Sequence, residues 1–493
     1  MKRTRSLRVL CGALLAVGLL GPMAAQAASS GPAAQQTRQI KQPTLDIQSF
    51  TLKNGLRVYV VEQHHAPVVT VNVTYNVGSR DEKPGRTGFA HLFEHMMFQG
   101  SANVGKAEHF KLINDYGGVM NGSTAFDRTN YFQTMPAHQL EMMLFLESDR
   151  MRSLDVSQAN LDNQRNAVQE ERRLRYDNRP YGLRFEKLWD ACFDNFAYKH
   201  STIGSMADLN AATLEDVTSF FKTYYAPNNA ALIIVGDVKL AAAKKLVEKY
   251  FADIPSATLP PLPDLTEKLD KGERVVSYED KLAPEEDVSL AYPSITGNHP
   301  DYFALELATM ILGGSESSRL YQRLIKREEA ASQTFAGIFQ LRGPSPIVMA
   351  ATAVGGKKAS DLLKAIDEEI VRMQTEKVTT EELSRAKTAA RASLVSELET
   401  SLYLSVRLGE NAVYFGDPAF ISKMAGMYDA VTLEDVQRVM NTYVKPSNRA
   451  VLYTLPAAKP APEAAPAPAA APAPAATPAP AAAPKPTPAG KKK

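Results

Sequence analysis

The chain has 493 residues, of which 44% are hydrophobic and 22% charged, and its formal net charge is +2. This length is too great for one compact core and predicts two or more domains. The basic residues collect at the two ends, because residues 1–27 and 457–493 each carry four net positive charges and the rest is acidic. The composition therefore excludes a broad basic surface for nucleic acid.

Residues 1–27 have the pattern of a signal peptide. Four basic residues precede an apolar run at 9–20, and an A-x-A cleavage site follows at 25–27. The run is too short to span a bilayer, and no later stretch predicts a transmembrane segment. We therefore expect a periplasmic or secreted protein. Cys192 is the only cysteine beyond the leader, which excludes an intrachain disulfide and predicts a lone buried thiol.

The first elements of the mature chain are predicted to be strands. Residues 28–44 are polar and are expected to be loose. Residues 50–61 carry two apolar runs around Asn54-Gly55, which predicts a β-hairpin. Residues 69–77 alternate valine or tyrosine with threonine or asparagine, a pattern typical of a half-buried strand with one face in solvent.

The stretch 89–100 reads FAHLFEHMMFQG and predicts a helix that is buried nearly all round. His91 and His95 are four positions apart and share one face, so they can bind a single ion. Glu94 lies on the same face, close enough to polarise a water molecule. An amphipathic helix with this stripe in solvent is the alternative, but the stripe holds only these three polar residues, which favours a divalent ion.

Further helices and strands follow the metal-binding motif. We expect a helix at 106–116, a strand pair at 119–136 with a turn near 126–128, and mostly helices from 138 to 177. In the last region one helical face carries Leu161, Gln164, Val168, Glu171 and Leu174. Glu170 points about 100° away from that face. Glu171 is thus an inward carboxylate without a basic residue on its own face, and the motif helix can supply its partner.

The chain contains an internal repeat. Thr213-Leu-Glu-Asp-Val217 and the residues after it match Thr432-Leu-Glu-Asp-Val436 and its sequel at a constant offset. The second copy lacks H-x-x-E-H. The proline-rich, charged residues 255–273 are expected to form a semi-rigid linker, and the Ala/Pro-rich tail 457–493 cannot build a core.

These motifs resemble the pitrilysin family of inverzincin zinc peptidases, in particular bacterial two-domain members similar to mitochondrial processing peptidase. The resemblance covers residues 45–456. It implies an α+β fold with two homologous mixed α/β domains, 45–254 and 274–456, each a sheet covered by helices, forming a clam-like chamber. It also implies one Zn²⁺ per chain, with ligands His91, His95 and Glu171, and Glu94 as the general base.

The resemblance implies further site residues. Where family members often have a supporting glutamate, this chain has Gln164, which keeps hydrogen bonding but not charge. Asn121, Gly122 and Thr124 match the family's substrate-binding edge strand, which would pair with an extended peptide. An ordinary sheet strand is the alternative for this segment.

The implied activity is zinc-dependent endopeptidase hydrolysis of extended peptides or unfolded protein segments. One alternative is a catalytically silent or partner-dependent assembly subunit of the same family. Another is a surface-binding protein that acts through its tail, whose last three lysines would attract anionic surfaces.

Family members resembling this one also supply an Arg and a Tyr to the reacting carbonyl, after a glycine-rich stretch of the second domain. Here that stretch is 312–320, and the following 341–360 contains Arg342 but no tyrosine. Arg407 and Tyr414 have suitable spacing but lie farther on, in a predicted helix. This pattern predicts a heterodimer in which a homologous subunit supplies the Arg/Tyr pair; the alternative is that a homodimer, or Arg407 and Tyr414, suffices.

Overall fold

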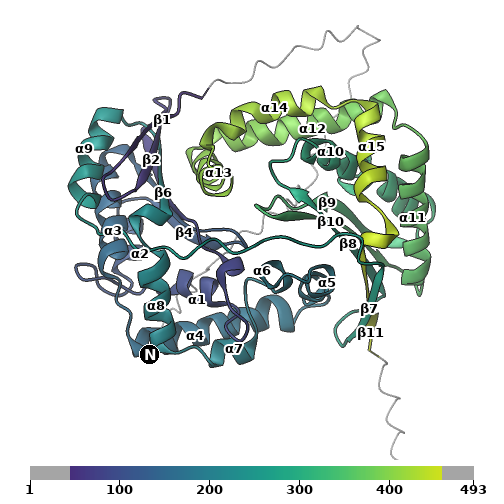
Figure 1. Ribbon diagram of the computed structural model, residues 1–493, viewed down its shortest axis with the longest axis horizontal. Helices are drawn as coiled ribbons and strands as arrows, with labels where there is room; N and C mark the ends of the chain where they lie inside the picture. Colours follow the sequence, from purple (N-terminus) through teal and green to yellow (C-terminus); the bar gives the residue numbers. More distant parts are fainter. Residues whose placement is uncertain (1–44, 458–493) are drawn as a thin grey trace, which may run out of the picture. The chain divides into compact units, whose positions relative to one another are not determined.

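The computed structural model describes residues 45–457, and those up to Pro456 form one compact unit (Figure 1). The first half, residues 45–254, has a six-stranded sheet in the order β1-β2-β6-β3-β5-β4. Its strands are β1 (Gln48–Thr51), β2 (Arg57–Glu62), β3 (Val68–Tyr75), β4 (Val119–Thr124), β5 (Thr129–Pro136) and β6 (Ala230–Gly236). Its helices are α1 (Phe89–Met96), α2 (Glu108–Asp115), α3 (Leu140–Ser153), α4 (Gln158–Arg172), α5 (Arg184–Cys192), α6 (Phe196–Lys199), α7 (Met206–Asn210), α8 (Leu214–Tyr224) and α9 (Leu240–Phe251).

The second half, residues 274–456, has a five-stranded sheet in the order β7-β11-β8-β10-β9. Its strands are β7 (Arg274–Asp280), β8 (Asp287–Thr296), β9 (Ala331–Ile338), β10 (Pro344–Ala353) and β11 (Ala450–Pro456). Its helices are α10 (Tyr302–Gly313), α11 (Ala359–Thr375), α12 (Thr380–Glu399), α13 (Ser401–Tyr414), α14 (Ile421–Ala430) and α15 (Leu433–Tyr443).

The two sheets have the same topology. Strands β2-β6-β3-β5-β4 correspond in order to β7-β11-β8-β10-β9, and each sheet has one parallel pair, β2 with β6 and β7 with β11. All other pairings of these named strands are antiparallel. This confirms the predicted class of two mixed, duplicated α/β halves. The domain boundaries and the chamber stay predictions.

The predicted hairpin at the start of the first half is confirmed. Strands β1 and β2 pair antiparallel with Thr51 opposite Arg57. Gly55 lies in the connection at φ 88°, a left-handed conformation that glycine adopts without steric cost. The second sheet has no counterpart of β1 among the described residues.

The prediction of a half-buried strand at 69–77 is wrong. The polar face of β3, with Thr70, Asn72 and Thr74, is fully buried because α13 of the second half packs on β3 and β6. Thr70 Oγ1 lies 2.8 Å from Ser401 Oγ, and Asn72 Nδ2 donates to the Ser405 carbonyl at 2.8 Å. The polar residues of the alternating pattern therefore form hydrogen bonds with α13 instead of with water.

Helix α5 makes the reciprocal contact, because it packs on β7, β8 and β11 of the second sheet. In the alignment of the two repeat copies, α5 corresponds to α13. Each half therefore packs the equivalent helix against the sheet of the other half. Leu188, Trp189 and Cys192 of α5 join the core beside Val348 of β10. Cys192 is the predicted lone buried thiol, and burial raises its pKa to about 12.

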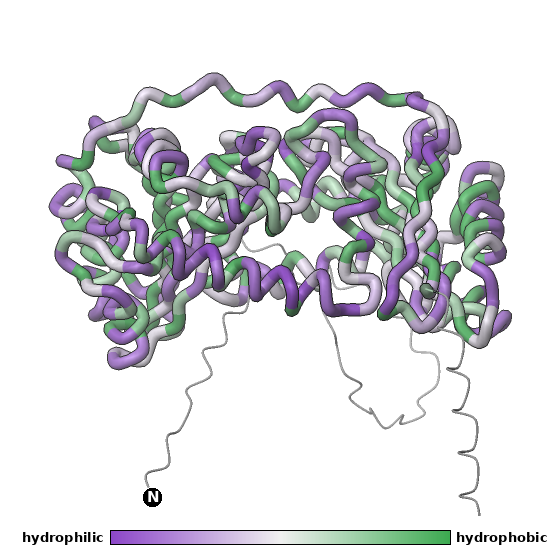
Figure 2. The backbone as a smooth tube through the Cα atoms, turned by 90° about the horizontal axis from the view of Figure 1, so that it is seen from below, coloured by the Kyte–Doolittle hydropathy of each residue, from purple (hydrophilic) through white to green (hydrophobic). Residues whose placement is uncertain are grey.

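Residues 255–273 form no helix or strand and run extended with hydrophilic and hydrophobic positions interspersed (Figure 2). Within residues 45–457, none of the helices has both the length and the apolar character needed to cross a membrane. The predicted leader and nearly all of the tail lie outside the described residues.

Candidate metal centre

Helix α1 carries the H-x-x-E-H motif in the predicted place. The helix begins after Gly88, which has φ 85°, and ends at Met96. All of its residues except His95 are buried, as the sequence predicts. Its apolar side chains pack around Tyr225 in the core of the first half, with the Phe93 ring 4.2 Å from that of Tyr225. The polar stripe faces α4.

The structure brings His91, His95 and Glu171 together, with one ligand atom of each within 4.8 Å of the others. Glu171 Oε2 lies 3.7 Å from His91 Nε2 and 3.3 Å from His95 Nε2. Ligands about 2.1 Å from a tetrahedral zinc ion are about 3.4 Å apart. The three residues are of types that bind zinc and lie close enough together that they could hold one metal ion. Glu170 is excluded from it, because it is exposed and pairs with Arg173.

Burial and neighbouring charges shift the pKa values of the cluster in different directions. Burial and the neighbouring His95 lower the pKa of His91 to about 3, so its ring stays neutral and free to bind metal. Burial opposes the charged form of Glu171, but the hydrogen bond with His95 and the electrostatic effect of its neighbours, which include His95 and Arg175, lower the pKa of Glu171 overall. His91 Nδ1 is buried without a hydrogen-bond partner among the described residues, so none of their acceptors competes for this ring.

Two expectations about the helix of Glu171 are wrong. Arg175 lies on the same side and pairs with Glu171 Oε1 at 2.8 Å, although no basic partner was expected there. Leu174, expected on the buried face, is 61% exposed. Arg175 lies four positions after Glu171, and residues at this spacing share a helix face, so the sequence itself contains this basic partner. The π-helical turn Arg173–Asp177 interrupts the α-helical spacing, which accounts for the exposure of Leu174. Glu171 can therefore offer Oε2 to a metal while Arg175 holds Oε1.

Glu94 is buried at the bottom of the cluster and is held by β4. Thr124 Oγ1 donates to Glu94 Oε2 at 2.6 Å. Gly122 lies so close to Glu94 that a Cβ there would stand 3.1 Å from Glu94 Oε1. Burial raises the pKa of Glu94, although His95 and the Thr124 hydrogen bond lower it. A carboxylate with a raised pKa suits a general base.

Gln164 occupies the position beside the cluster that the sequence predicts. Its side chain hydrogen-bonds with His95, and its Nε2 also donates to Asn163 Oδ1 at 2.7 Å. Burial opposes protonation of His95, but the contact with Glu171 raises the pKa of His95, and Gln164 adds to this. The role of Gln164 as a neutral support for a metal ligand stays a prediction.

The predicted substrate-binding residues lie on an edge. Strand β4 is the last of its sheet among the described residues, and only one side is paired, with β5. Asn121 Oδ1 accepts from the Gly122 amide at 2.9 Å. The Thr124 hydroxyl donates its hydrogen bond to Glu94, a contact that the sequence does not predict. The binding role of Asn121, Gly122 and Thr124 stays a prediction.

The candidate arginines of the second half make other contacts. Arg342 donates from its backbone to Asp127 and from Nη1 to Asn76. Arg407 is paired with Glu397 through two bonds of 2.9 Å. After His95, Arg128 also lowers the pKa of Glu94; it lies in the β4–β5 turn and pairs with Glu410 of α13 at 2.9 Å. No sequence pattern predicts a role for Arg128, because its partner Glu410 lies in the second half of the chain.

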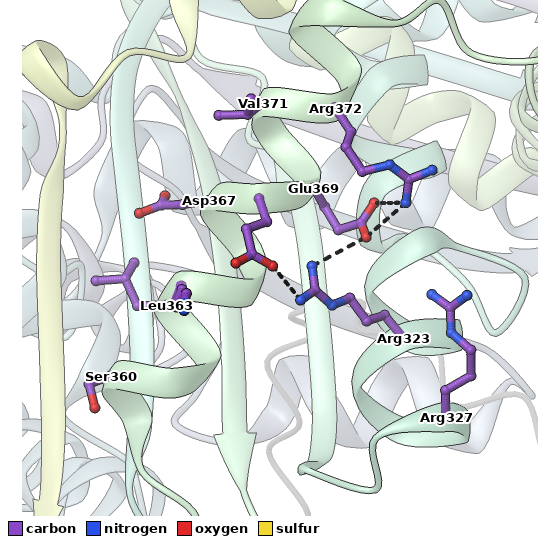
Figure 3. Close-up of a pocket in the computed structure, with 10 residues that line it drawn as sticks. Arg323, Arg327, Ser360, Leu363, Asp367, Glu369, Val371 and Arg372 are labelled. Atoms are coloured by element: carbon purple, nitrogen blue, oxygen red, sulfur yellow. Dashed lines mark hydrogen bonds and ion pairs between the residues drawn. The ribbon is translucent and has the colours of Figure 1, made fainter.

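A cavity of about 860 Å³ lies away from the cluster, between α11 and residues 321–327 (Figure 3). Arg323 and Arg372 point toward Glu369 there, and Arg323 also pairs with Glu368. These charges are already paired with one another. The residues that line this cavity include none of the metal cluster, so its size does not make it the functional site.

The fold and the cluster define a duplicated α/β chain with an inverted H-x-x-E-H metal centre in its first half. The family model described as insulinase (peptidase family M16) matches residues 57–205, and that described as peptidase M16 inactive domain matches residues 211–390. The chain belongs to peptidase family M16, the pitrilysin family.

The relatives include proteins named as zinc proteases. The chain is 31% identical to zinc protease PqqE of Helicobacter pylori over 83% of this chain and 93% of that protein. It is 24% identical to mitochondrial-processing peptidase subunit beta of Lentinula edodes, over 80% and 86%. The crystal structure of a protease from Helicobacter pylori superimposes with a TM-score of 0.81, at 31% identity, over 84% of this chain and all of that one. The family also includes inactive domains, as the second description states.

Proposed function

We propose that this protein is a zinc-dependent endopeptidase that hydrolyses extended peptides or unfolded protein segments. The observation that carries the proposal is the convergence of His91, His95 and Glu171 beside a buried Glu94. One Zn²⁺ per chain would be held by the two imidazole Nε2 atoms and by Glu171 Oε2. The unpaired edge of β4 lies next to Glu94, so an extended peptide added there would pass the cluster.

The residues divide the work of hydrolysis. A bound zinc ion would supply Lewis-acid activation of water and of the scissile carbonyl. Glu94 takes a proton from the attacking water at its carboxylate and returns it to the leaving amine. Thr124 fixes the rotamer of Glu94 through its 2.6 Å hydrogen bond, so the carboxylate needs no rearrangement before the proton transfer.

Glu94→Gln tests this assignment. The amide keeps the size of the side chain but cannot accept the proton, so peptide cleavage should fall by at least about 10²- to 10⁴-fold. Zinc content, measured by metal analysis of the purified protein, should stay at one per chain, because Glu94 is not a ligand. A variant that lost its zinc, or that cleaved a library of unstructured peptides normally, would show that the roles are wrongly assigned.

We further propose that the active form contains a homologous subunit that supplies the missing Arg/Tyr pair. Arg342 and Arg407 are held by Asp127, Asn76 and Glu397, so neither is free to serve a substrate carbonyl without breaking these contacts. One relative is itself named as a subunit. Each preorganised donor at the carbonyl oxygen contributes roughly 10²- to 10³-fold to the rate.

The test is an assay of the purified chain alone, loaded with one zinc ion, against unstructured peptides. Near-silence that a co-purifying M16 homologue reverses supports the heterodimer. Full activity of a monomer, confirmed by light scattering, contradicts it. The Arg407→Lys variant tests the alternative that Arg407 itself serves the substrate carbonyl. Its activity should be unchanged unless Arg407 has this role.

We also propose that the protein is exported to the periplasm or secreted, as the pattern of residues 1–27 indicates. Mass spectrometry of the mature protein from its native host should find the N-terminus at Ala28. A mature chain that retained Met1 would contradict export.

A further inference from the structure

Helix α1 has no side-chain cap from its own N-terminal residue, and a distant carboxylate takes that place. Glu82 Oε2 accepts from the Gly88 amide at 2.9 Å and Oε1 from the Ala90 amide at 2.8 Å. These are N–H groups at the start of a helix that would otherwise lack partners. The Glu82 side chain is fully buried. A buried negative charge at this end of α1 is also favoured by the helix dipole.

The charge of Glu82 is balanced by His200. His200 Nε2 lies 2.9 Å from Glu82 Oε2, and His200 Nδ1 lies 2.9 Å from the Phe196 carbonyl. A carbonyl oxygen can only accept, so Nδ1 carries a proton, and Nε2 donates to the carboxylate. The two residues therefore form a buried ion pair directly behind the first turn of the metal-binding helix.

His200 belongs to a segment, residues 200–208, that holds the start of α1 at two more points. Asp208 Oδ2 accepts from the Thr87 amide at 3.0 Å and from Thr87 Oγ1 at 2.5 Å. Gly88 and Gly204 meet backbone to backbone, because a Cβ on Gly88 would lie 2.6 Å from the Ile203 carbonyl oxygen and 2.9 Å from Gly204 Cα. Only glycine fits at this crossing.

The same segment also holds the end of α4. Arg172, the residue after Glu171, donates from Nη1 to the Gly204 carbonyl at 2.5 Å and to Glu186 Oε2 at 2.8 Å. Ser201 Oγ donates to the same Glu186 oxygen at 2.9 Å. The 200–208 segment is thus in contact with the helix that carries His91 and His95 and with the helix that carries Glu171.

We propose that the 200–208 segment is a clamp that fixes the two ligand-bearing helices relative to each other, with Glu82 and His200 as its positioning residues. Both side chains act through the start of α1 and through the 200–208 segment, because their hydrogen bonds go to the Gly88 and Ala90 amides, to the Phe196 carbonyl and to each other instead of to the metal ligands. This inference rests on the proposed zinc function and extends it. Outer partners that orient metal ligands typically change metal affinity by about 10- to 100-fold when removed.

The experiment measures zinc release from Glu82→Gln with a chromogenic chelator in excess. The amide keeps the volume of Glu82 but turns one acceptor into a donor that faces backbone N–H groups and an imidazolium. We expect zinc to dissociate about 10-fold faster or more. His200→Gln should act in the same direction, and the double variant should lose less than the sum of the two, because the pair acts as one unit.

Asp287→Asn is the matched control. Asp287 is also a fully buried carboxylate, paired with Arg184 at 3.1 Å, but it lies on β8 of the second sheet. Its substitution should lower the melting temperature and leave zinc release unchanged. If Glu82→Gln behaved in the same way, its role would be structural only and the proposal would be overturned. If Glu82→Gln failed to fold, Asp208→Asn would take its place, with faster zinc release expected again.

A readout without metal separates this inference from the proposed function. In the apo protein, hydrogen exchange should speed up in His200→Gln both at the Gly88 and Ala90 amides and in the last turn of α4. Faster exchange at α1 alone, or at neither helix, would contradict a clamp. If the native protein bound no zinc at all, the proposed function would fail, whereas this exchange pattern would still decide about the clamp.

Discussion

The two halves of this protein share a topology but differ in what their equivalent helices carry. Between β3 and β4 the first half has α1 with its two histidines, and between β8 and β9 the second half has α10, whose residues are almost all apolar and buried. In the alignment of the two repeat copies, Glu171 and Gln164 correspond to Ala390 and Leu383 of α12, both buried. Helices α10 and α12 pack against each other.

The comparison shows that the same strand order forms in a half with the H-x-x-E-H motif and in a half without it. At these two positions the second half packs an alanine and a leucine, where the first half has a carboxylate and an amide. The second sheet nevertheless has the same strand order. The candidate metal ligands therefore stand where the equivalent pair of helices in the second half packs with apolar side chains. The first half itself supplies the polar support that these ligands need, from Thr124, Gln164 and the Glu82–His200 pair.

The largest expected effect comes from Glu171→Ala, which replaces this carboxylate with the alanine that the second half has at the equivalent position, Ala390. Zinc should be lost, and peptide cleavage should fall at least about 10³-fold, because the metal supplies several kcal/mol of transition-state stabilisation. The apo protein should still fold, since Ala390 shows that this helix pair packs with alanine. Metal analysis and thermal unfolding measure the two effects. Glu170→Ala is the control and should keep its zinc; an unfolded Glu171→Ala would mean that the halves are not comparable.

The next largest effect is a pH dependence of the free energy of unfolding, caused by His200 of the first half. Burial opposes protonation of His200, but the hydrogen bond and charge of Glu82, with the Phe196 and Ser79 carbonyls, raise the pKa of His200 above its ordinary value of 6.5. Its charge therefore stabilises the fold fully below pH 6.5, and this stabilisation is lost as the pH rises through the raised value.

The His200→Gln variant measures this contribution. The free energy of unfolding of the apo protein should fall by about 3 kcal/mol at pH 6, the usual cost of leaving one partner of a buried ion pair alone. The deficit should shrink as the pH rises toward 9. Chemical denaturation at a series of pH values gives the curve. A deficit that did not change with pH would show that His200 is neutral in the folded protein.

A smaller effect tests whether the exchanged helices join the two halves into one folding unit. Gly409 of α13 lies against Thr74 of the first sheet, and a Cβ there would clash with Thr74 Oγ1. Gly409→Ala should destabilise the protein by about 1–3 kcal/mol. Gly426→Ala, in α14 with open space around it, should be neutral or stabilise by about 0.5–1 kcal/mol. Unfolding in two separate transitions would contradict a single unit.

The smallest effect is expected at the tail. Truncation after Pro456 removes a segment without apolar periodicity, so neither the melting temperature nor peptide cleavage should change. This sharpens the comparison, because the second half should be complete at β11. A clear drop in either quantity would show that the tail docks on the rest of the protein.

The sequence by itself determined the features that depend on local periodicity. The spacing of His91 and His95 placed them on one helix face, and the helical face of Glu171 distinguished it from Glu170. Asn54-Gly55 predicted the first hairpin, and the internal repeat predicted the duplication. These inferences succeed because backbone geometry relates residues a few positions apart in the same way in any fold.

Only the tertiary structure decided which side chains from distant segments support the site. The buried polar face of β3 requires α13, which belongs to the other half of the chain, and the ion pair of Glu82 requires His200. Such contacts depend on how helices and sheets pack, which the separation of residues in the chain does not reveal.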